Sequence, residues 1–448
     1  MSAARRPYQI DAVRWFLARP DRRGIFAHAT SAGKTLEAID VSQALGASRI
    51  LIVAPAVARP VWVREFQKWG AGEARPIIYG RGRTSGLSKA KTASRDAAYA
   101  ANIQVVSYKL LKEMDADARD LVIFDEIHAL RDPVSQQSRI AKAYLRRHSG
   151  IPVLGLSATL IPTEVKQLWN PLDTFWPHQW GRAQANGGIS WDFQGRYCGR
   201  EENEYGVQYR GAKDEAALAA LAARLAPYIH RVTDRDVGPY LPPLHAEPLY
   251  VDEKRTDVDI AAEWYESAAA DDAGVLAVIA YTRETAWAIA AKLDTEYVVT
   301  GEMSPEKRQS VLDAARALSA PAVLVCTSEA VRESVSLSFC KRALVLQWRT
   351  SPAQAIQLMG RFPRQDAESN RPCFIQYVVL PGDESRAEVL HERIAAIQVL
   401  MKADRKGEQL QEIFAPRPLT EERLEDMFAQ MMGTMRLDAE WNEGGDDE

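Results

Sequence analysis

The chain has 448 residues, of which 46% are hydrophobic and 26% are charged. This length favours two or three domains, and this balance is typical of a globular protein. The formal net charge of −4 argues against a passive nucleic-acid coat but leaves room for a local basic track. Because no apolar run is long enough to span a membrane and no signal peptide follows Met1, we expect a cytoplasmic protein with no membrane partner.

From about residue 24 to residue 177, short apolar runs alternate with helical patterns. Runs of this kind suit strands that are buried on both faces, as in a parallel sheet flanked by helices. They cover residues 25–27, 50–53, 103–106, 121–124 and 153–156. The sequence therefore predicts a first α/β domain over residues 1–177.

Residues 178–247 interrupt this alternation and are rich in Gly, Trp, Tyr and Arg, with one Ala/Leu-rich helix near residues 215–228. We interpret them as an insert and linker. Apolar runs then resume at residues 275–279, 297–299, 322–325, 343–346 and 374–379, which predicts a second, mainly parallel sheet over residues 248–415. Residues 416–448 are expected to form a C-terminal helix and an acidic tail.

Four cysteines, Cys198, Cys326, Cys340 and Cys373, lie far apart in the sequence and form no CxxC pair. This spacing argues against a zinc site or a disulfide framework. We expect reduced, structural thiols.

A loop of small residues follows the run at 25–27 and leads through Gly33, Lys34 and Thr35 into a helix. The backbone N–H groups of such a loop, together with the helix dipole, bind phosphate oxygens. Lys34 would reach the β- and γ-phosphates of ATP, and the Thr35 hydroxyl would bind Mg²⁺. His28 stands where the usual pattern begins with glycine. The remaining loop residues of the expected ATP site are Thr30, Ser31 and Ala32.

Two adjacent carboxylates, Asp125 and Glu126, end the apolar run at 121–124. They are costly after a buried strand unless a cation is present. Asp125 could hold Mg²⁺ through its water shell, and Glu126 could polarise the attacking water. A solvated Asp-Glu pair at a strand end is the alternative interpretation.

In the second domain, Gln357, Arg361 and Arg364 lie in one short segment. Arginines three residues apart share one side of a helical turn and could neutralise charge developing on the γ-phosphate. A single Arg-x-x-Arg is usually only surface, so this hypothesis depends on the phosphate loop and the carboxylates.

Together these motifs resemble the superfamily-2 helicases and translocases, and among them the Swi/Snf-type ATPases. The resemblance implies two RecA-like domains that share one ATP–Mg²⁺ site. It assigns adenine recognition to Gln9 and the coupling of hydrolysis to domain movement to His128, Ser157 and Thr159. It also assigns contacts with DNA to Pro55, Ser107, Tyr108 and Thr327.

Residues 191–209 and 229–243 resemble the annealing-helicase branch of that family, which implies a duplex- or fork-tracking bare motor from a bacterial or phage-infected cell. Three departures remain. Ser157-Ala158-Thr159 has the form usual in strand-separating helicases, residues 331–334 lack the family's glycines, and His230 and Thr233 replace expected basic residues.

A basic stretch comprises Arg81, Arg83, Lys89, Lys91 and Arg95. It could follow DNA phosphates, or it could be a solvated loop. The main hypothesis is an ATP-dependent translocase that anneals or remodels branched DNA, with duplex or forked DNA favoured over single strands. The alternatives are a strand-separating DNA helicase and a non-hydrolysing, nucleotide-switched DNA-binding scaffold.

Overall fold

The computed structural model describes residues 5–81, 87–114, 119–161, 163–204, 206–251, 255–271, 274–318, 321–331, 335–348, 351–363, 371–401 and 405–415. Residues Met1–Phe414 form one compact unit. The C-terminal helix and acidic tail expected over residues 416–448 lie outside the described residues.

The first sheet has seven strands in the order β3-β4-β2-β5-β6-β1-β9, and all its strand pairs are parallel. Each of the five predicted apolar runs lies within one of these strands. Their bounds are β1 Arg23–His28, β2 Ile50–Val53, β3 Ala74–Pro76, β4 Ile103–Val106, β5 Leu121–Asp125, β6 Val153–Ser157 and β9 Ile229–Val232.

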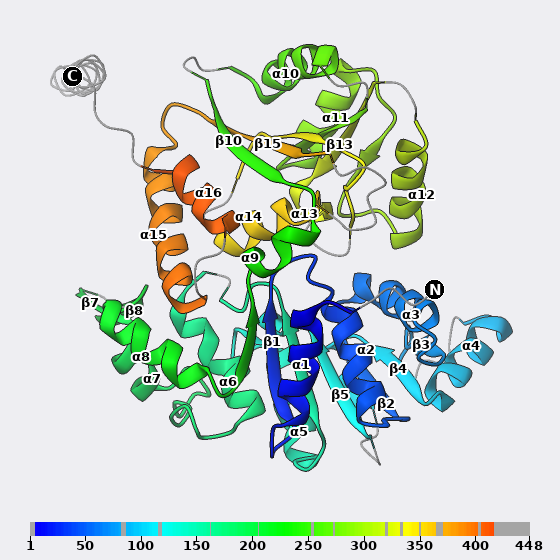
Figure 1. The fold of residues 1–448 in the computed structure, drawn as a ribbon, viewed down its shortest axis with the longest axis vertical. Coiled ribbons are helices and arrows are strands. Elements are labelled where there is room, and N and C mark those ends of the chain that lie inside the picture. The colour runs from blue at the N-terminus through cyan, green and yellow to red at the C-terminus, as the bar shows by residue number, and fades with distance from the viewer. Residues whose placement is uncertain are drawn as a thin grey trace, which may run out of the picture. The chain divides into compact units, whose positions relative to one another are not determined.

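Two helical layers cover the first sheet (Figure 1). Phe16, Ile39 and Trp62 pack from α1, α2 and α3 onto one face, and Tyr144 and Phe175 pack from α5 and α6 onto the other. Alternate residues of the strands supply the two cores, which explains their continuous apolar sequences. The helices are α1 Pro7–Leu17, α2 Lys34–Ala44, α3 Arg59–Lys68, α4 Lys89–Ala100, α5 Gln136–Arg147 and α6 Trp169–Phe175, with short 3₁₀ turns at Ala56–Ala58, Leu111–Glu113, Ile127–Leu130 and Val165–Leu168.

Strand β9 comes from the region expected to be only an insert and linker. It pairs in parallel with β1, in the register Ile25↔Ile229, and forms an edge of the first sheet. The limit expected at residue 177 therefore does not coincide with the end of the first sheet. The strand is short, and two polar residues separate its apolar ends, so it lacks the continuous apolar pattern of the central strands.

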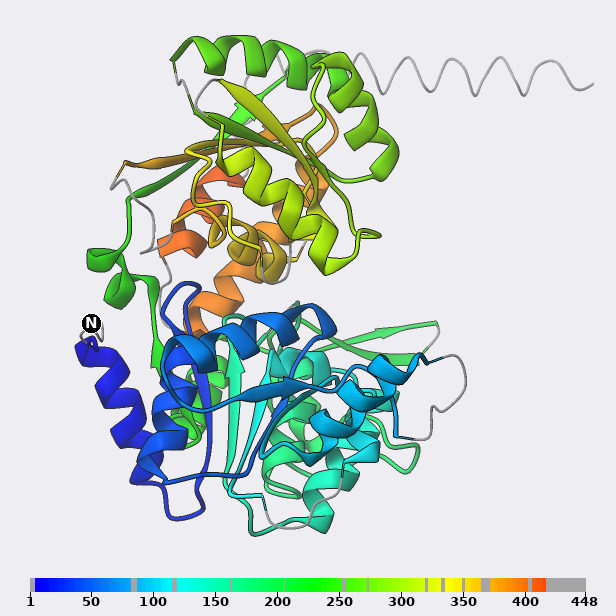
Figure 2. The ribbon, with the colours of Figure 1, turned by 90° about the vertical axis from the view of Figure 1, so that its right-hand side faces the viewer.

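The segment before β9, residues 191–225, forms a small subdomain. It contains α7 Trp191–Tyr197, an antiparallel hairpin of β7 Gly199–Asn203 and β8 Gly206–Arg210, and α8 Glu215–Leu225. Phe193, Leu218 and Leu221 join the same core as α5 and α6. The chain then continues through α9 Asp234–Val237 and a 3₁₀ turn at Gly238–Tyr240, which lies between the two sheets in both views (Figures 1 and 2).

The second sheet has six parallel strands in the order β10-β15-β14-β11-β13-β12. Trp264 and Ile289 pack on one face from α10 and α11, and Leu312, Ile356 and Leu390 pack on the other from α12, α14 and α15. The strands are β10 Leu244–Tyr250, β11 Val275–Ala280, β12 Val298–Val299, β13 Ala322–Thr327, β14 Arg342–Val345 and β15 Cys373–Val379. The helices are α10 Asp257–Asp271, α11 Arg283–Lys292, α12 Pro305–Arg316, α13 Ser328–Val331, α14 Pro352–Met359, α15 Glu384–Met401 and α16 Arg405–Ile413.

Two parallel sheets, each between helices, confirm the predicted α/β class. All four cysteines are free and buried. Among the described helices, none is long and apolar enough to cross a membrane.

Candidate nucleotide-binding site

The phosphate loop connects the carboxyl end of β1 to the first turn of α2. Ser31 and Gly33 have positive φ angles of 64° and 94°, and this left-handed backbone turns the chain from the strand into the helix. Lys34 Nζ donates hydrogen bonds to the carbonyl oxygens of His28 (3.0 Å) and Ala29 (3.1 Å). Burial lowers the pKa of Lys34, and nearby carboxylates oppose that shift.

Helix α1 holds the other side of this loop. Gln9 Nε2 and Tyr8 Oη both donate to the carbonyl oxygen of Ala32, at 2.9 and 3.1 Å. A Cβ on Gly33 would lie 2.6 Å from Gln9 Nε2, so a side chain at that position would displace Gln9. The structure thus brings the predicted adenine-reading residue, Gln9, against the phosphate loop.

His28 is fully buried and has a structural role at the start of the loop. Its Nδ1 donates to Glu37 Oε2 at 2.7 Å, and its Nε2 lies 2.9 Å from His230 Nδ1 on β9. Its ring stacks on Phe26 with centroids 4.8 Å apart. The two histidines that depart from the family pattern are therefore partners of each other, which explains both departures.

Asp125 is the last residue of β5 and Glu126 follows it, on the same edge of the sheet as the phosphate loop. Trp62 Nε1 donates to Asp125 Oδ2 at 2.8 Å. Burial and the charge of Glu126 raise the pKa of Asp125. Burial acts in the same direction on Glu126, but its contact with His128 and the charges of nearby cations outweigh burial and lower its pKa.

A chain of contacts leads from Glu126 to the second sheet. His128 Nδ1 lies 3.2 Å from Glu126 Oε2 and 3.3 Å from Ser157 Oγ. The backbone N–H of Thr159 donates to Ser157 Oγ at 3.2 Å. Gln357 Nε2 on α14 then donates to Thr159 Oγ1 at 3.0 Å, in a buried bond. The predicted coupling residues and Gln357 thus form one continuous path.

The segment after α14 also contacts the phosphate loop. Ser31 Oγ donates to the carbonyl oxygen of Pro363 at 3.0 Å. The positive charge of Arg361 contributes to lowering the pKa values of both Lys34 and Glu126, which places its guanidinium beside the predicted site. Arg364, the second predicted finger, lies outside the described residues.

Lys406 on α16 is a site residue that the sequence motifs did not indicate. Its buried ammonium donates to Thr30 Oγ1 at 3.0 Å and to Asp234 Oδ1 at 2.6 Å. It joins the phosphate loop, α9 and α16, which are far apart in the sequence. No local pattern marks this lysine, because its partners are 376 and 172 residues away.

The donor set fits a Mg²⁺–nucleotide. Mg²⁺ is usually bound by one or two carboxylates, waters and substrate phosphates. Among the described residues, no group of three or more His, Cys, Asp or Glu side chains could hold a metal without such a substrate. Thr35 at the start of α2 and Asp125 would hold the metal, and its charge would relieve the repulsion between the two adjacent, half-buried carboxylates.

The residues that are predicted to contact DNA differ in their exposure. Tyr108 is 3% exposed and its hydroxyl donates to the Asp125 carbonyl oxygen at 2.7 Å, so its side chain supports the site. Thr327 is also 3% exposed. A contact of either residue with DNA stays a prediction. Arg81 and Lys89 are exposed, and Pro55 and Ser107 are partly exposed. Arg83 lies outside the described residues.

The fold has two parallel α/β sheets, and the candidate nucleotide site brings together a phosphate loop from the first and α14 from the second. Residues 8–292 match the model of the SNF2-related domain family. The chain therefore belongs to the SNF2-related domain family, within the Swi/Snf-type ATPases of superfamily 2.

Two curated relatives and one solved structure illustrate the similarity. The chain is 28% identical over 219 residues to the SWI/SNF-related matrix-associated actin-dependent regulator of chromatin subfamily A-like protein 1 of Xenopus tropicalis, covering 48% of this chain and 21% of that protein. It is 27% identical over 195 residues to the human DNA excision repair protein ERCC-6, covering 39% and 13%. These matches span about a fifth or less of either relative. The structure of S. cerevisiae Dbp5 bound to RNA and ADP BeF3 shares the fold, with a TM-score of 0.52, 13% identity, and coverage of 91% of this chain and 93% of that chain.

Proposed function

We propose that the protein is an ATP-hydrolysing motor that acts on DNA. The observation that carries this proposal is the path from Glu126 through His128, Ser157 and Thr159 to Gln357. It links a carboxylate suited to ATP hydrolysis with a helix of the second sheet. A protein that only bound nucleotide would not need this link, whereas a motor must transmit the state of the nucleotide between its two halves.

Each side chain of the site has a separate task. Lys34 would bind the β- and γ-phosphates, while Gln9 would contact the adenine. Mg²⁺, held by Thr35 and Asp125, would neutralise charge on the phosphate oxygens. Glu126 would orient the attacking water and accept its proton. Arg361 would stabilise negative charge that develops on the γ-phosphate.

The proposal that the motor moves along DNA rests on the family to which the chain belongs. The curated relatives include a protein named for DNA excision repair and one named as a probable ATP-dependent DNA helicase. Exposed Arg81 and Lys89 offer positive charge for phosphates of the backbone. Within this class we favour a translocase that anneals or remodels branched DNA, because residues 191–209 and 229–243 resemble the annealing-helicase branch.

A second candidate is a strand-separating DNA helicase. The Ser157-Ala158-Thr159 form of the coupling element favours it, and the structure places this element in direct contact with Gln357. The two candidates share the ATPase chemistry and differ in what the motor does to the duplex.

Labelled DNA distinguishes them. With ATP, a translocase of the annealing kind is expected to rewind a bubble held open by a single-strand-binding protein and to leave a plain tailed duplex intact. Displacement of the labelled strand from the tailed duplex would instead favour the helicase. Lys34→Ala is the matched control, since it should abolish either activity by removing the phosphate-binding cation. Unchanged ATP turnover and unchanged DNA activity in this variant would refute the motor.

A further inference from the structure

A separate cavity of about 210 Å³ lies in the second sheet. Its walls come from residues just after β11 and β14, from α13 and α14, and from β15. They include Tyr281, Glu329, Gln347, Gln354, Leu358 and Tyr377. None of them is among the predicted site residues.

The position of this cavity is one where α/β sheets commonly bind ligands. The chain passes from β11 to β12 and β13 on one side of β11, and then returns to β14 and β15 on the other side. The order of strands thus reverses between β11 and β14. Ligands of open parallel sheets bind beyond the carboxyl ends of strands at such a reversal.

Two side chains of the cavity wall form hydrogen bonds to residues outside the cavity. Gln347 Nε2 donates to Asp257 Oδ2 at 2.7 Å, and Trp348 Nε1 donates to the Val378 carbonyl oxygen at 2.9 Å. The positions of the Gln347 amide and the Trp348 ring are therefore fixed before any ligand arrives. Such a preformed shape is typical of binding sites.

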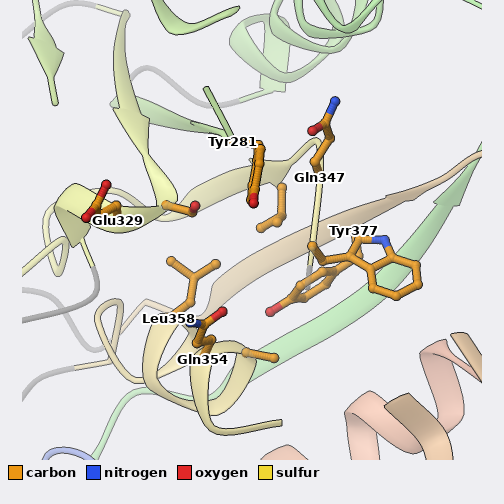
Figure 3. Close-up of a pocket in the computed structure, with 10 residues that line it drawn as sticks. Tyr281, Glu329, Gln347, Gln354, Leu358 and Tyr377 are labelled. Carbon is orange, nitrogen blue, oxygen red and sulfur yellow. The ribbon is translucent and has the colours of Figure 1, made fainter. Parts of the chain in front are cut away.

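Inside the cavity, the hydroxyl group of Tyr377 lacks a partner. Tyr377 is fully buried, and its Oη makes no hydrogen bond to the described residues. Figure 3 shows this hydroxyl and that of Tyr281 pointing from opposite sides into the space bordered by Leu358 and Gln354. An unsatisfied buried hydroxyl is costly, so a polar partner placed in the cavity would stabilise it.

The lining indicates the chemical class of that partner. Among the described lining residues there is no lysine or arginine, so the cavity does not suit a phosphate. It combines aromatic and apolar walls with amide, hydroxyl and carboxylate groups, which suit a flat ring with a polar edge. Its volume is below the roughly 300–1,000 Å³ of pockets for drug-sized ligands, so it would hold a fragment of the size of one base.

We infer that this cavity binds one unpaired nucleobase of the DNA on which the protein acts. The inference rests on the proposed DNA function and deepens it, since it assigns a base contact to the second sheet. Tyr281, which is 38% exposed, would lie against the ring at the mouth of the cavity. Gln354 and Tyr377 would bond to the polar edge of the base.

This inference is tested by combining substitutions in the protein with removal of bases from the DNA and comparing their effects on binding. Dissociation constants are measured for a duplex with a two-nucleotide bubble and for the same bubble with both unpaired positions of one strand made abasic. For the unmodified protein, removal of the bases should weaken binding about tenfold, because one stacked base contributes roughly that much. Tyr281→Ala and Gln354→Ala should bind the bubble with bases more weakly and bind the abasic bubble unchanged.

The matched control is Trp287→Ala, which removes an exposed aromatic side chain of α11 that does not line the cavity. For this variant, removal of the bases should weaken binding as much as it does for the unmodified protein. Equal effects of base removal in all four proteins would overturn the base-binding inference, even if DNA still stimulates ATP hydrolysis. Failure of the unmodified protein to bind DNA would overturn the proposed function and the inference together.

Discussion

His28 stands where a phosphate loop usually begins with glycine, and its buried ring is held by Glu37 and His230. The three side chains come from β1, α2 and β9, so they tie the edge strand of the first sheet to the helix of the phosphate loop. A change in the charge of these three side chains would therefore alter the contacts at the start of the phosphate loop.

This cluster gives the protein a predicted sensitivity to acid. Burial, together with the charge of His28, lowers the pKa of His230 from 6.5 to about 4. Between pH 6.5 and pH 4 this histidine binds a proton more readily in the unfolded chain than in the folded protein. Its contribution to the free energy of unfolding is therefore fully present above pH 6.5 and is lost as the pH drops toward 4. Because His230 is only partly buried, we expect a loss of about 1–2 kcal/mol.

The test compares melting temperatures of the unmodified protein and His230→Gln at pH 7 and pH 4.5. The variant should lose less stability on acidification than the unmodified protein. Parallel decreases in the two proteins would show that His230 does not contribute to the pH dependence.

Lys406 gives a second prediction at this scale. Lys406→Met removes the bond to Thr30 and leaves the Asp234 carboxylate buried without this cation, so the phosphate loop should lose its alignment. We expect the KM for ATP to rise about tenfold while kcat changes less, since the lysine acts by positioning the loop through Thr30.

Steady-state ATPase kinetics measure this split. Lys406→Arg keeps the charge and should restore most of the affinity, and exposed Lys68→Met is the control. An unchanged KM in Lys406→Met, or a KM raised equally by Lys68→Met, would contradict a positioning role.

At the scale of elements, helix α14 ends directly against the phosphate loop. A Cβ on Gly360 would lie 2.1 Å from Thr30 Oγ1 and 2.3 Å from Thr30 Cβ, so this approach requires glycine. Gly360→Ala should push the end of α14 away from the loop and misplace Arg361. Because misplacement by about 1 Å can cost about a hundredfold in rate, we expect kcat to fall by tenfold or more.

Gly195→Ala is the control for this substitution, since a Cβ there meets nothing within 4 Å. Both variants are measured for ATP turnover and for melting temperature. Normal turnover in a folded Gly360→Ala protein would show that the contact of α14 with Thr30 is not needed for hydrolysis.

The elements also show how far the sequence predicts the structure. The central strands were predictable because burial on both faces requires continuous apolar residues. Strand β9 was not, since an edge strand needs no such run and its Ile-His-Arg-Val sequence has polar residues at its centre. The nucleotide motifs were predictable because phosphate binding requires a local pattern. Lys406 and the His28–His230 contact were not, because only the tertiary fold brings their partners together.

At the scale of the whole molecule, groups from the two halves of the chain meet at the candidate nucleotide site. In the phosphate loop, Ser31 contacts Pro363 and Thr30 contacts Lys406, and Thr159 contacts Gln357. Loss or gain of the γ-phosphate would change the balance of these contacts. We propose that DNA controls the cycle of ATP binding and hydrolysis at this site.

ATP hydrolysis rates measured with duplex DNA, forked DNA, single-stranded DNA and RNA, each at two salt concentrations, test that claim most directly. We predict that duplex or forked DNA stimulates hydrolysis more than single strands or RNA, and that raising the salt weakens the stimulation because phosphate contacts release counterions. Equal rates with and without DNA, or a clear preference for RNA, would contradict a motor that acts on DNA.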